Sequence, residues 1–174
     1  MDDPVVAELE RRWQTLPMPT TGAIRCLVRR TSPGVHDTPA AVTVAPGRGV
    51  IGDRYSASAK RHFGAQVTLI ERRVVELLAG GPERWHVPGD NLVVDLDLSE
   101  AGMPVGTRLA SSDGAVLEIT PVPHAGCDKF RERLGDHAIR WVNDRTRRDR
   151  RLRGLHARIL VGGTLRVGDH LVRV

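Results

Sequence analysis

The C-terminal residues 156–174 constrain the fold more than any other part of the sequence. They contain three short apolar runs, "HARILV", "TLRV" and "HLVRV", which Gly-Gly and Gly-Asp steps separate. Runs of this length joined by such turns are typical of antiparallel strands. Further strand-like runs occupy residues 21–31, 41–45, 65–70, 91–94, 107–111 and 115–120. Strands at such short spacing favour a barrel or a sandwich over a doubly wound sheet.

Three segments have the apolar spacing of amphipathic helices. In residues 4–16 the apolar side chains are Val5, Val6, Leu9, Trp13 and Leu16. Residues 71–81 form a second predicted helix that ends at Gly80, because glycine commonly stops helices. Residues 127–144 form a third, interrupted at Gly135. The sequence therefore predicts three helical segments beside roughly nine strands.

The sequence is basic, with a formal net charge of +5, and six arginines crowd into residues 145–153. A basic excess predicts anionic partners such as phosphates, a cofactor with a phosphate tail, or nucleic acid. No apolar run approaches the roughly 18 residues that span a bilayer, and the N-terminal residues lack a signal-peptide pattern. We therefore expect a cytoplasmic protein without a membrane partner. In that reducing compartment Cys26 and Cys127 should both be free thiols.

Residues 47–52, "GRGVIG", match the Gly-rich pattern of dinucleotide-binding loops. Such a unit also requires a crossover helix whose apolar face covers the sheet. Residues 53–64 offer only Tyr55 and Phe63 as large apolar side chains. We therefore predict an irregular Gly-rich loop here and not a dinucleotide site.

Cys127 lies at the predicted junction between a strand and a helix, in "ITPVPHAGCDKFRERLG". Unpaired backbone N–H groups and the helix dipole stabilise an anion at a helix N-terminus, which favours a thiolate there. His124 and Lys129 are close in sequence and can stabilise that anion further, and Gly126 lets another molecule approach the backbone. The position suits a nucleophile, a sulfur carrier or a soft-metal ligand. A buried, inert cysteine is the alternative.

The other candidate metal ligands form no recognisable site. Cys26 lies inside the strand-like run "AIRCLVRR" and is expected to be a small core residue. The seven histidines show no close zinc spacing, and His124 with Cys127 makes one H-x-x-C pair without a second. A structural zinc site is therefore not expected.

Five segments resemble, in order and spacing, the MOSC domains, the family related to the C-terminal domain of molybdenum-cofactor sulfurase. They are "GVIGDRY", "AQVTLIE", "PGDNLVV", "HAGCDKFRERLG" and "RLRGLHARILVGGTLRVGD". The resemblance runs from about Thr21 to Val174. It implies a mainly β fold, a distorted closed β-barrel with peripheral α-helices over residues 21–174, preceded by an N-terminal helical extension over residues 1–20.

The resemblance also implies a role for Cys127, which matches the cysteine proposed to carry persulfide sulfur or to ligate molybdenum in related reductases. Family members are linked to the molybdenum cofactor, to sulfur transfer for metal–sulfur centres and to reduction of N-hydroxylated compounds. The chain has no room for the pyridoxal-phosphate domain of the sulfurases or for a ferredoxin domain. A separate sulfur donor, similar to a cysteine desulfurase, or a separate electron-donor protein is therefore expected.

Under this resemblance, Cys127 either holds a terminal sulfur or binds molybdenum in the pterin cofactor, molybdopterin. Basic side chains are candidates to hold the pterin phosphate, namely Arg54, Lys60, Arg61 and Arg153. Asn91 can offer two donors and an acceptor to a pterin edge. His124 could orient or protonate the ligand. Larger reductases carry an Arg-Pro-Asn type segment where this chain has residues 89–91, "GDN", so their cofactor contacts transfer poorly.

Two other functions stay open. A thiol hydrolase or transferase could use Cys127 with His124 and no metal. A basic barrel could instead bind anions or RNA through the arginines of residues 145–153. That run has no interleaved aromatic residues for base stacking, which argues against nucleic acid.

Overall fold

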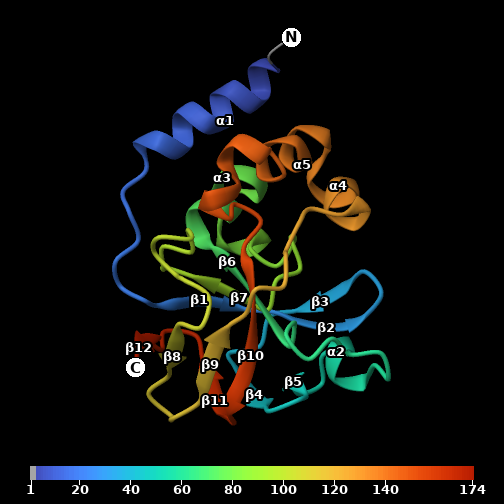
Figure 1. Cartoon of the computed structure of the whole chain (residues 1–174). Helices are drawn as coiled ribbons and strands as arrows, with labels where there is room; N and C mark the ends of the chain where they lie inside the picture. Colours follow the sequence, from blue (N-terminus) through green and yellow to red (C-terminus); the bar gives the residue numbers. More distant parts are fainter. Residues whose placement is uncertain (1–2) are drawn as a thin grey trace.

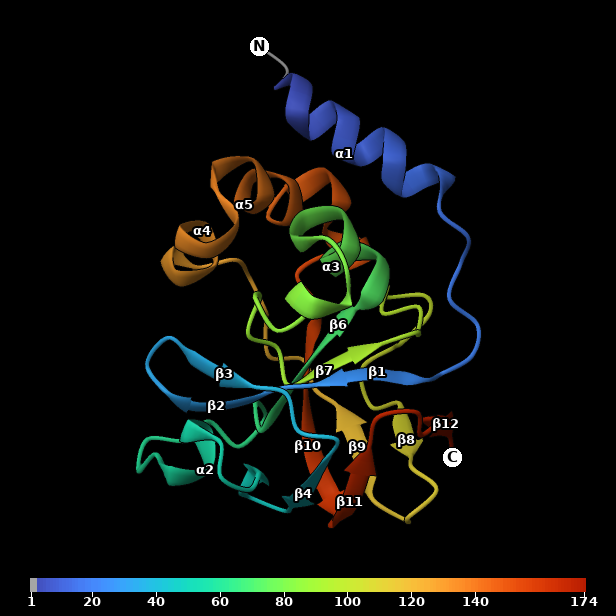
Figure 2. The same cartoon turned by 180° about the vertical axis from the view of Figure 1, so that it is seen from behind.

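The computed structural model describes residues 3–174, and its largest element is a strongly curled sheet with most of the helices gathered beyond one end (Figures 1 and 2). In spatial order its seven strands are β1 (Ile24–Leu27), β7 (Leu92–Val94), β6 (Val67–Glu71), β10 (Leu155–Val161), β9 (Val116–Ile119), β8 (Arg108–Ala110) and β12 (Val172–Arg173). Only β6 and β7 pair in parallel. The helix α3 (Arg72–Ala79) lies in the connection between them, as a parallel pair requires.

Two smaller sheets flank the large one. The first consists of β11 (Gly163–Arg166), β4 (Ala41–Ala45) and β5 (Gly49–Val50). The second is a hairpin of β2 (Arg29–Ser32) and β3 (Val35–Asp37). The hairpin lies on the same side of the molecule as the short helix α2 (Arg54–Ala57), below α4 (Asp128–Leu134) in Figure 1.

The expectation of a mainly β, closed barrel holds only in part. The fold is mixed α/β, and the seven-stranded sheet is an open half-barrel whose edge strands are β1 and β12. The sheet curls enough that an isolated bridge joins Ala23 to His170 beside those edges. The peripheral helices are present as expected.

The glycine turns near the C-terminus do not make the hairpins that the sequence suggested. Strand β10 lies between β6 and β9, β11 pairs with β4, and β12 pairs with β8. Gly162 packs closely on β4, where an added Cβ would lie 2.9 Å from the Val44 carbonyl oxygen. The three strands expected here are therefore present, but the turns pass the chain from one sheet to another and the strands do not pair with one another.

Two apolar cores occupy the two faces of the large sheet. Leu69 and Leu92 face the core inside the curl. Their neighbours Ile70 and Val93 face a second core, which the helices cover. All five residues of β6 are buried, as expected for a strand that is covered on both faces.

The N-terminal helix α1 (Pro4–Thr15) covers this second core. Trp13 meets the fully buried Trp141 of α5 (Asp136–Val142) edge-on, with 5.9 Å between ring centroids. The Arg73 guanidinium lies over the Trp13 ring at 4.0 Å, a cation–π contact. The helix predicted over residues 4–16 is confirmed; residues 1 and 2 of the predicted extension lie outside the described residues.

Part of the arginine run holds α1 in place. Arg147 and Arg150 belong to the 3-10 helix η2 (Arg145–Arg150) and contact the Glu10 carboxylate at 2.9 and 2.5 Å. The same carboxylate accepts a hydrogen bond from Trp141 Nε1 at 3.2 Å. These two arginines therefore anchor a helix and do not form a free basic surface.

The Gly-rich stretch of residues 47–52 has no crossover helix after it. It forms a turn and β5, and only the single turn of α2 separates it from the loop that leads to β6. As expected, the stretch is not part of a βαβ unit, but it is not an irregular loop throughout, because Gly49–Val50 pairs with β4. Across residues 3–174, no helix combines the length and the apolar content needed to cross a bilayer.

Candidate functional site

Cys127 is exposed and occupies the N-cap position of α4. The loop before it is pinned to the end of α5. Gly126 donates its N–H to Asn143 Oδ1 at 2.8 Å, and Asn143 Nδ2 donates to the Gly126 carbonyl at 3.0 Å. An added Cβ at residue 126 would lie 3.0 Å from Ile139 Cγ1, so the glycine allows this close approach. The thiol is therefore presented to solvent from a fixed backbone.

Arg133, on the same helix, joins α4 to the loop that precedes β7. Its Nη1 donates to the Pro88 carbonyl oxygen at 3.2 Å. Burial lowers the pKa of Arg133, the nearby Arg54 lowers it further, and Cys127 opposes that shift. Helix α4 therefore carries the thiol at its start and a cationic side chain in its last turn.

A cavity of about 470 Å³ lies between α2, the loop that follows it and the first turn of α4. Five basic residues line it, namely Arg30, Arg54, Lys60, His62 and Lys129. Tyr55, Ser58 and Ala65 complete the lining, so no carboxylate faces it. We call it the basic cavity. Its volume is in the range of roughly 300–1,000 Å³ that small-molecule sites occupy, and its charge selects an anion.

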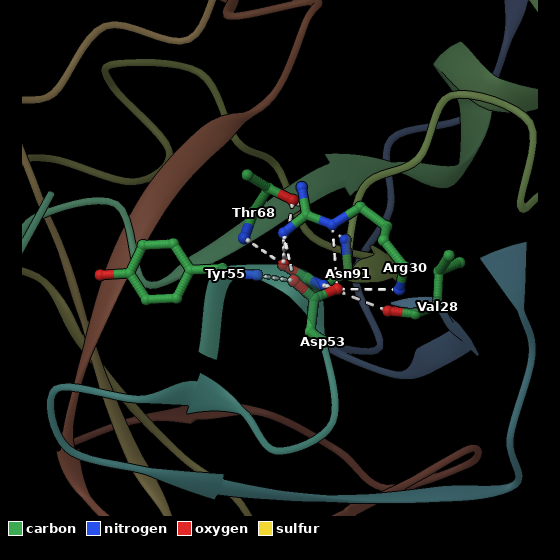
Figure 3. A network of polar contacts seen from close by, with 6 residues as sticks. All are labelled: Val28, Arg30, Asp53, Tyr55, Thr68 and Asn91. Carbon is green, nitrogen blue, oxygen red and sulfur yellow. Dashed lines mark hydrogen bonds and ion pairs between the residues drawn. The ribbon is translucent and has the colours of Figure 1, made fainter. Parts of the chain in front are cut away.

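A buried polar network fixes Arg30 at the wall of the basic cavity (Figure 3). The Asp53 carboxylate, 1% exposed, accepts hydrogen bonds from Arg30 Nε at 2.9 Å and from Arg30 Nη2 at 2.8 Å. It also accepts from the backbone N–H of Tyr55 at 2.9 Å and from Asn91 Nδ2 at 3.2 Å. Burial raises the pKa of Asp53, but the hydrogen bonds and charge of Arg30 outweigh it and hold that pKa below its ordinary value.

Asn91 makes its hydrogen bonds inside the protein. Its Nδ2 also donates to the Val28 carbonyl at 3.1 Å, and its Oδ1 accepts from the Thr68 backbone N–H at 3.2 Å (Figure 3). The side chain is 1% exposed. Asn91 therefore orients Asp53 and Arg30 and has no free polar edge to offer a ligand.

A second buried ion pair joins Asp90 to Arg153. Arg153 Nη1 contacts the two Asp90 oxygens at 2.8 and 2.6 Å, and the side chains are 1% and 8% exposed for Asp90 and Arg153. The guanidinium also lies over the Phe130 ring at 4.6 Å. This pair joins the segment just before β7 to the turn just before β10, and through Phe130 it also contacts α4.

His124 lies beside this pair. Its Nε2 is 3.7 Å from Asp90 Oδ1, and its ring lies 4.4 Å from that of His156. Burial lowers the pKa of His124 well below its ordinary value, and the charge of Arg153 adds to the shift, so the ring is neutral at pH 7. Among residues 3–174 no hydrogen bond joins the Cys127 sulfur to His124. Two buried atoms here have no partner in the described chain, His124 Nδ1 and Arg153 Nε.

The structure therefore divides the predicted site residues into groups. Cys127 is on the surface, Arg54 and Lys60 line the basic cavity, and Arg61 is exposed with its Nη1 bonded to the Ser56 carbonyl. Asn91, Arg153 and His124 belong to the buried networks. Cys26 is buried, as expected, and burial raises the pKa of its thiol. Within residues 3–174, no group of three potential metal ligands comes together.

The sequence interpretation missed Arg30, Asp53 and Arg133. Arg30 ends an apolar run, and Asp53 follows a Gly-rich stretch, which are ordinary positions for surface charges. Their pairing spans 23 residues, and a single sequence carries no signal for it.

Comparison with known proteins gives a family match over most of the chain. The family model described as MOSC domain matches residues 59–172. This range contains Lys60, Asp90, Cys127 and Arg153. No curated protein matches the sequence.

Solved structures of low sequence identity share the fold. The YuaD protein from Bacillus subtilis superposes with a TM-score of 0.63 at 17% identity, over 87% of this chain and 94% of its own. YiiM from Escherichia coli gives a TM-score of 0.54 at 15% identity, over 91% of this chain and 70% of its own. YiiM from Geobacillus stearothermophilus gives 0.54 at 18% identity, over 89% and 74%. The curled sheet and its peripheral helices are thus a shared architecture.

Proposed function

Because the chain belongs to the MOSC domain family, we propose that Cys127 is a reactive thiol that carries persulfide sulfur or ligates the molybdenum of a pterin cofactor. The observation that carries the proposal is the exposed Cys127 at the start of α4, whose first turn also supplies Lys129 to the basic cavity. A soft thiolate suits both roles.

The residues present fit a phosphate-bearing pterin in charge and size. Arg54, Lys60 and Lys129 would hold the phosphate, and Arg30 would face it from the fixed network with Asp53. Asn91 would act by positioning that network. No three-ligand protein cluster lies within residues 3–174, so a molybdenum atom would depend on the pterin and on Cys127. When bound, it would supply the two-electron redox chemistry that reduction of N-hydroxylated compounds needs.

For sulfur transfer, the donor would be a cysteine persulfide on a separate protein. The Cys127 thiol loses its proton to solvent, and the thiolate attacks the outer sulfur of the donor persulfide. A new S–S bond forms at Cys127 as the donor S–S bond breaks, and the donor cysteine leaves as a thiolate that takes up a proton. One S–S bond replaces another, so no further oxidant or reductant is required.

His124 fits a supporting role better than that of a general base. It is neutral, lies beside Asp90 and makes no hydrogen bond to Cys127 within the described residues, which weakens the alternative of a metal-free Cys/His enzyme. The RNA-binding alternative is also weakened, because Arg147 and Arg150 are engaged with Glu10.

Mass spectrometry tests this proposal. The intact mass and the molybdenum content are measured on the same gently purified sample of wild type, Cys127→Ala and Cys26→Ala, from cells that make the molybdenum cofactor. We expect one added sulfur atom or stoichiometric molybdenum in the wild type and in Cys26→Ala, and neither in Cys127→Ala. Absence of both from the wild type, or their persistence in Cys127→Ala, would refute the role of Cys127.

A further inference from the structure

A second cavity, of about 370 Å³, lies between residues 120–125 and η2 with the turn that follows it. It shares no lining residue with the basic cavity. Its most conspicuous residues are arginines of the 145–153 run, which the function proposed above does not use. We call it the arginine cavity.

The 3-10 geometry of η2 sorts these arginines into two sets. A 3-10 helix has three residues per turn, so every third residue lies on the same face. Arg145, Arg148 and Arg151 follow this spacing, and all three line the arginine cavity. Arg147 and Arg150 lie on another face and bind Glu10. One face of the run therefore anchors α1, and the other presents three cations to the cavity.

The three cavity arginines are not neutralised within the described chain. In residues 3–174, none of Arg145, Arg148 and Arg151 has a carboxylate oxygen within 4.0 Å. Of the two acidic residues in the lining, Asp144 is engaged by Arg147 and caps η2 through Thr146, which leaves Glu100. The cavity therefore has a surplus of positive charge.

Arg151 is held in an unusual conformation at this wall. It ends η2 with φ 48° and ψ 46°, a left-handed conformation that is uncommon for a non-glycine residue. Its Nη1 donates to the Met103 carbonyl oxygen at 2.6 Å. The backbone and this hydrogen bond together fix the guanidinium at the cavity.

Two buried polar atoms without partners belong to residues that line the same cavity. His124 Nδ1 and Arg153 Nε have no hydrogen-bond partner in the described chain, although a buried polar atom normally has one. The ring of His124 is neutral, so one of its nitrogens can donate and the other can accept. Both residues therefore carry, in the wall of the cavity, a polar group that the described chain leaves unsatisfied.

From these features we infer that the arginine cavity binds a small organic anion, with Arg145 and Arg148 holding its phosphate or carboxylate group and with His124 and Arg153 lining the buried end. Val105, Val142 and Leu155 also line the cavity and would cover an apolar body. The volume admits one small metabolite. This inference does not depend on the chemistry of Cys127.

Isothermal titration calorimetry with two probes tests the inference, and the probes separate the two sources of negative charge. Pyrophosphate represents phosphates and citrate represents carboxylates. We expect at least one of them to bind the wild-type protein and to bind the Arg145→Gln/Arg148→Gln double variant about a hundredfold more weakly, since each lost charge-assisted hydrogen bond is worth about tenfold. Both side chains are exposed, so the variant should keep the wild-type melting temperature.

Two matched variants are the controls. Arg166→Gln/Arg173→Gln removes the same charge from two exposed strand positions that line neither cavity, and Arg173→Gln alone removes one charge from an exposed strand end. Both should bind the probe within about threefold of wild type, because neither altered residue lines the arginine cavity. Nitrogen-15 NMR of the histidine side chains adds a site-specific readout, in which the probe shifts the His124 signal. No binding to wild type, equal losses in the control variants, or an unshifted His124 signal would each overturn the inference.

Discussion

Replacing Asp90 with Asn should lower the free energy of unfolding by about 3–5 kcal/mol, the usual cost of breaking a buried ion pair from one side. The change leaves the Arg153 guanidinium with its charge, 8% exposed, and without its carboxylate partner. The contact of Arg153 with the Phe130 ring does not replace a carboxylate, because a cation–π contact is worth about 0.5–2 kcal/mol. The loss is a large share of the roughly 5–15 kcal/mol that stabilises a typical domain.

Urea unfolding followed by circular dichroism measures this loss as a fall in the midpoint at constant slope. Asp113→Asn is the matched control, because Asp113 pairs with Arg166 at 3.8 Å while the two side chains are 44% and 52% exposed. Exposed pairs contribute about 0–1 kcal/mol, so this control should unfold close to wild type. Equal midpoints for the two variants would show that the Asp90–Arg153 pair does not hold β7 to β10.

Replacing Asp53 with Asn should cost about 3 kcal/mol, the lower end of the same range, because Arg30 is 17% exposed and keeps some solvent contact. The carboxylate accepts from Arg30, Tyr55 and Asn91, and an amide at this position turns one acceptor into a donor that faces other donors. The variant should also bind anions more weakly in the basic cavity, because Arg30 loses its fixed position there.

The pH dependence of unfolding gives this prediction a second measurement. The pKa of Asp53 is lower in the folded protein than its ordinary value of about 3.9, so its contribution to stability is complete above that value and is lost as the pH falls through the folded pKa. The wild type should therefore lose more stability than Asp53→Asn between pH 5 and pH 2. Asp37→Asn, whose carboxylate pairs with Arg29 while 41% exposed, is the control and should follow the wild-type curve. Parallel curves for the wild type and Asp53→Asn would contradict the role of this network.

The helices and their ends were predictable from the sequence, because local patterns determine them. The spacing of Leu9 and Trp13 predicted α1, Gly80 ends α3, and Gly135 separates α4 from α5 with φ values of 100° and 87° at the two glycines. The position of Cys127 at a helix start also followed from local sequence, and the structure adds that it is exposed.

Strand partners were not predictable, because alternation fixes which face a residue occupies and leaves open which strand lies beside it. Strand β11 therefore could be expected as a strand, while its pairing with β4 could not. The buried ion pairs were not predictable for a similar reason, since Asp90 and Arg153 lie 63 residues apart in the sequence. Likewise, the arginines of residues 145–153 could not be sorted from the sequence into those that bind Glu10 and those that line the arginine cavity. That sorting depends on the 3-10 helix η2, which the sequence did not predict.

The reaction of the folded protein with a small persulfide tests the role of Cys127 most directly. The reduced protein is exposed to glutathione persulfide, and persulfides are then tagged and located by peptide mass spectrometry. Denatured protein, in which Cys26 and Cys127 are both accessible, controls for detection. We expect the folded protein to carry persulfide at Cys127 while the buried Cys26 stays a thiol. A Cys127 that stays unmodified in the folded protein, while the denatured chain reacts at both cysteines, would contradict its role as a sulfur carrier.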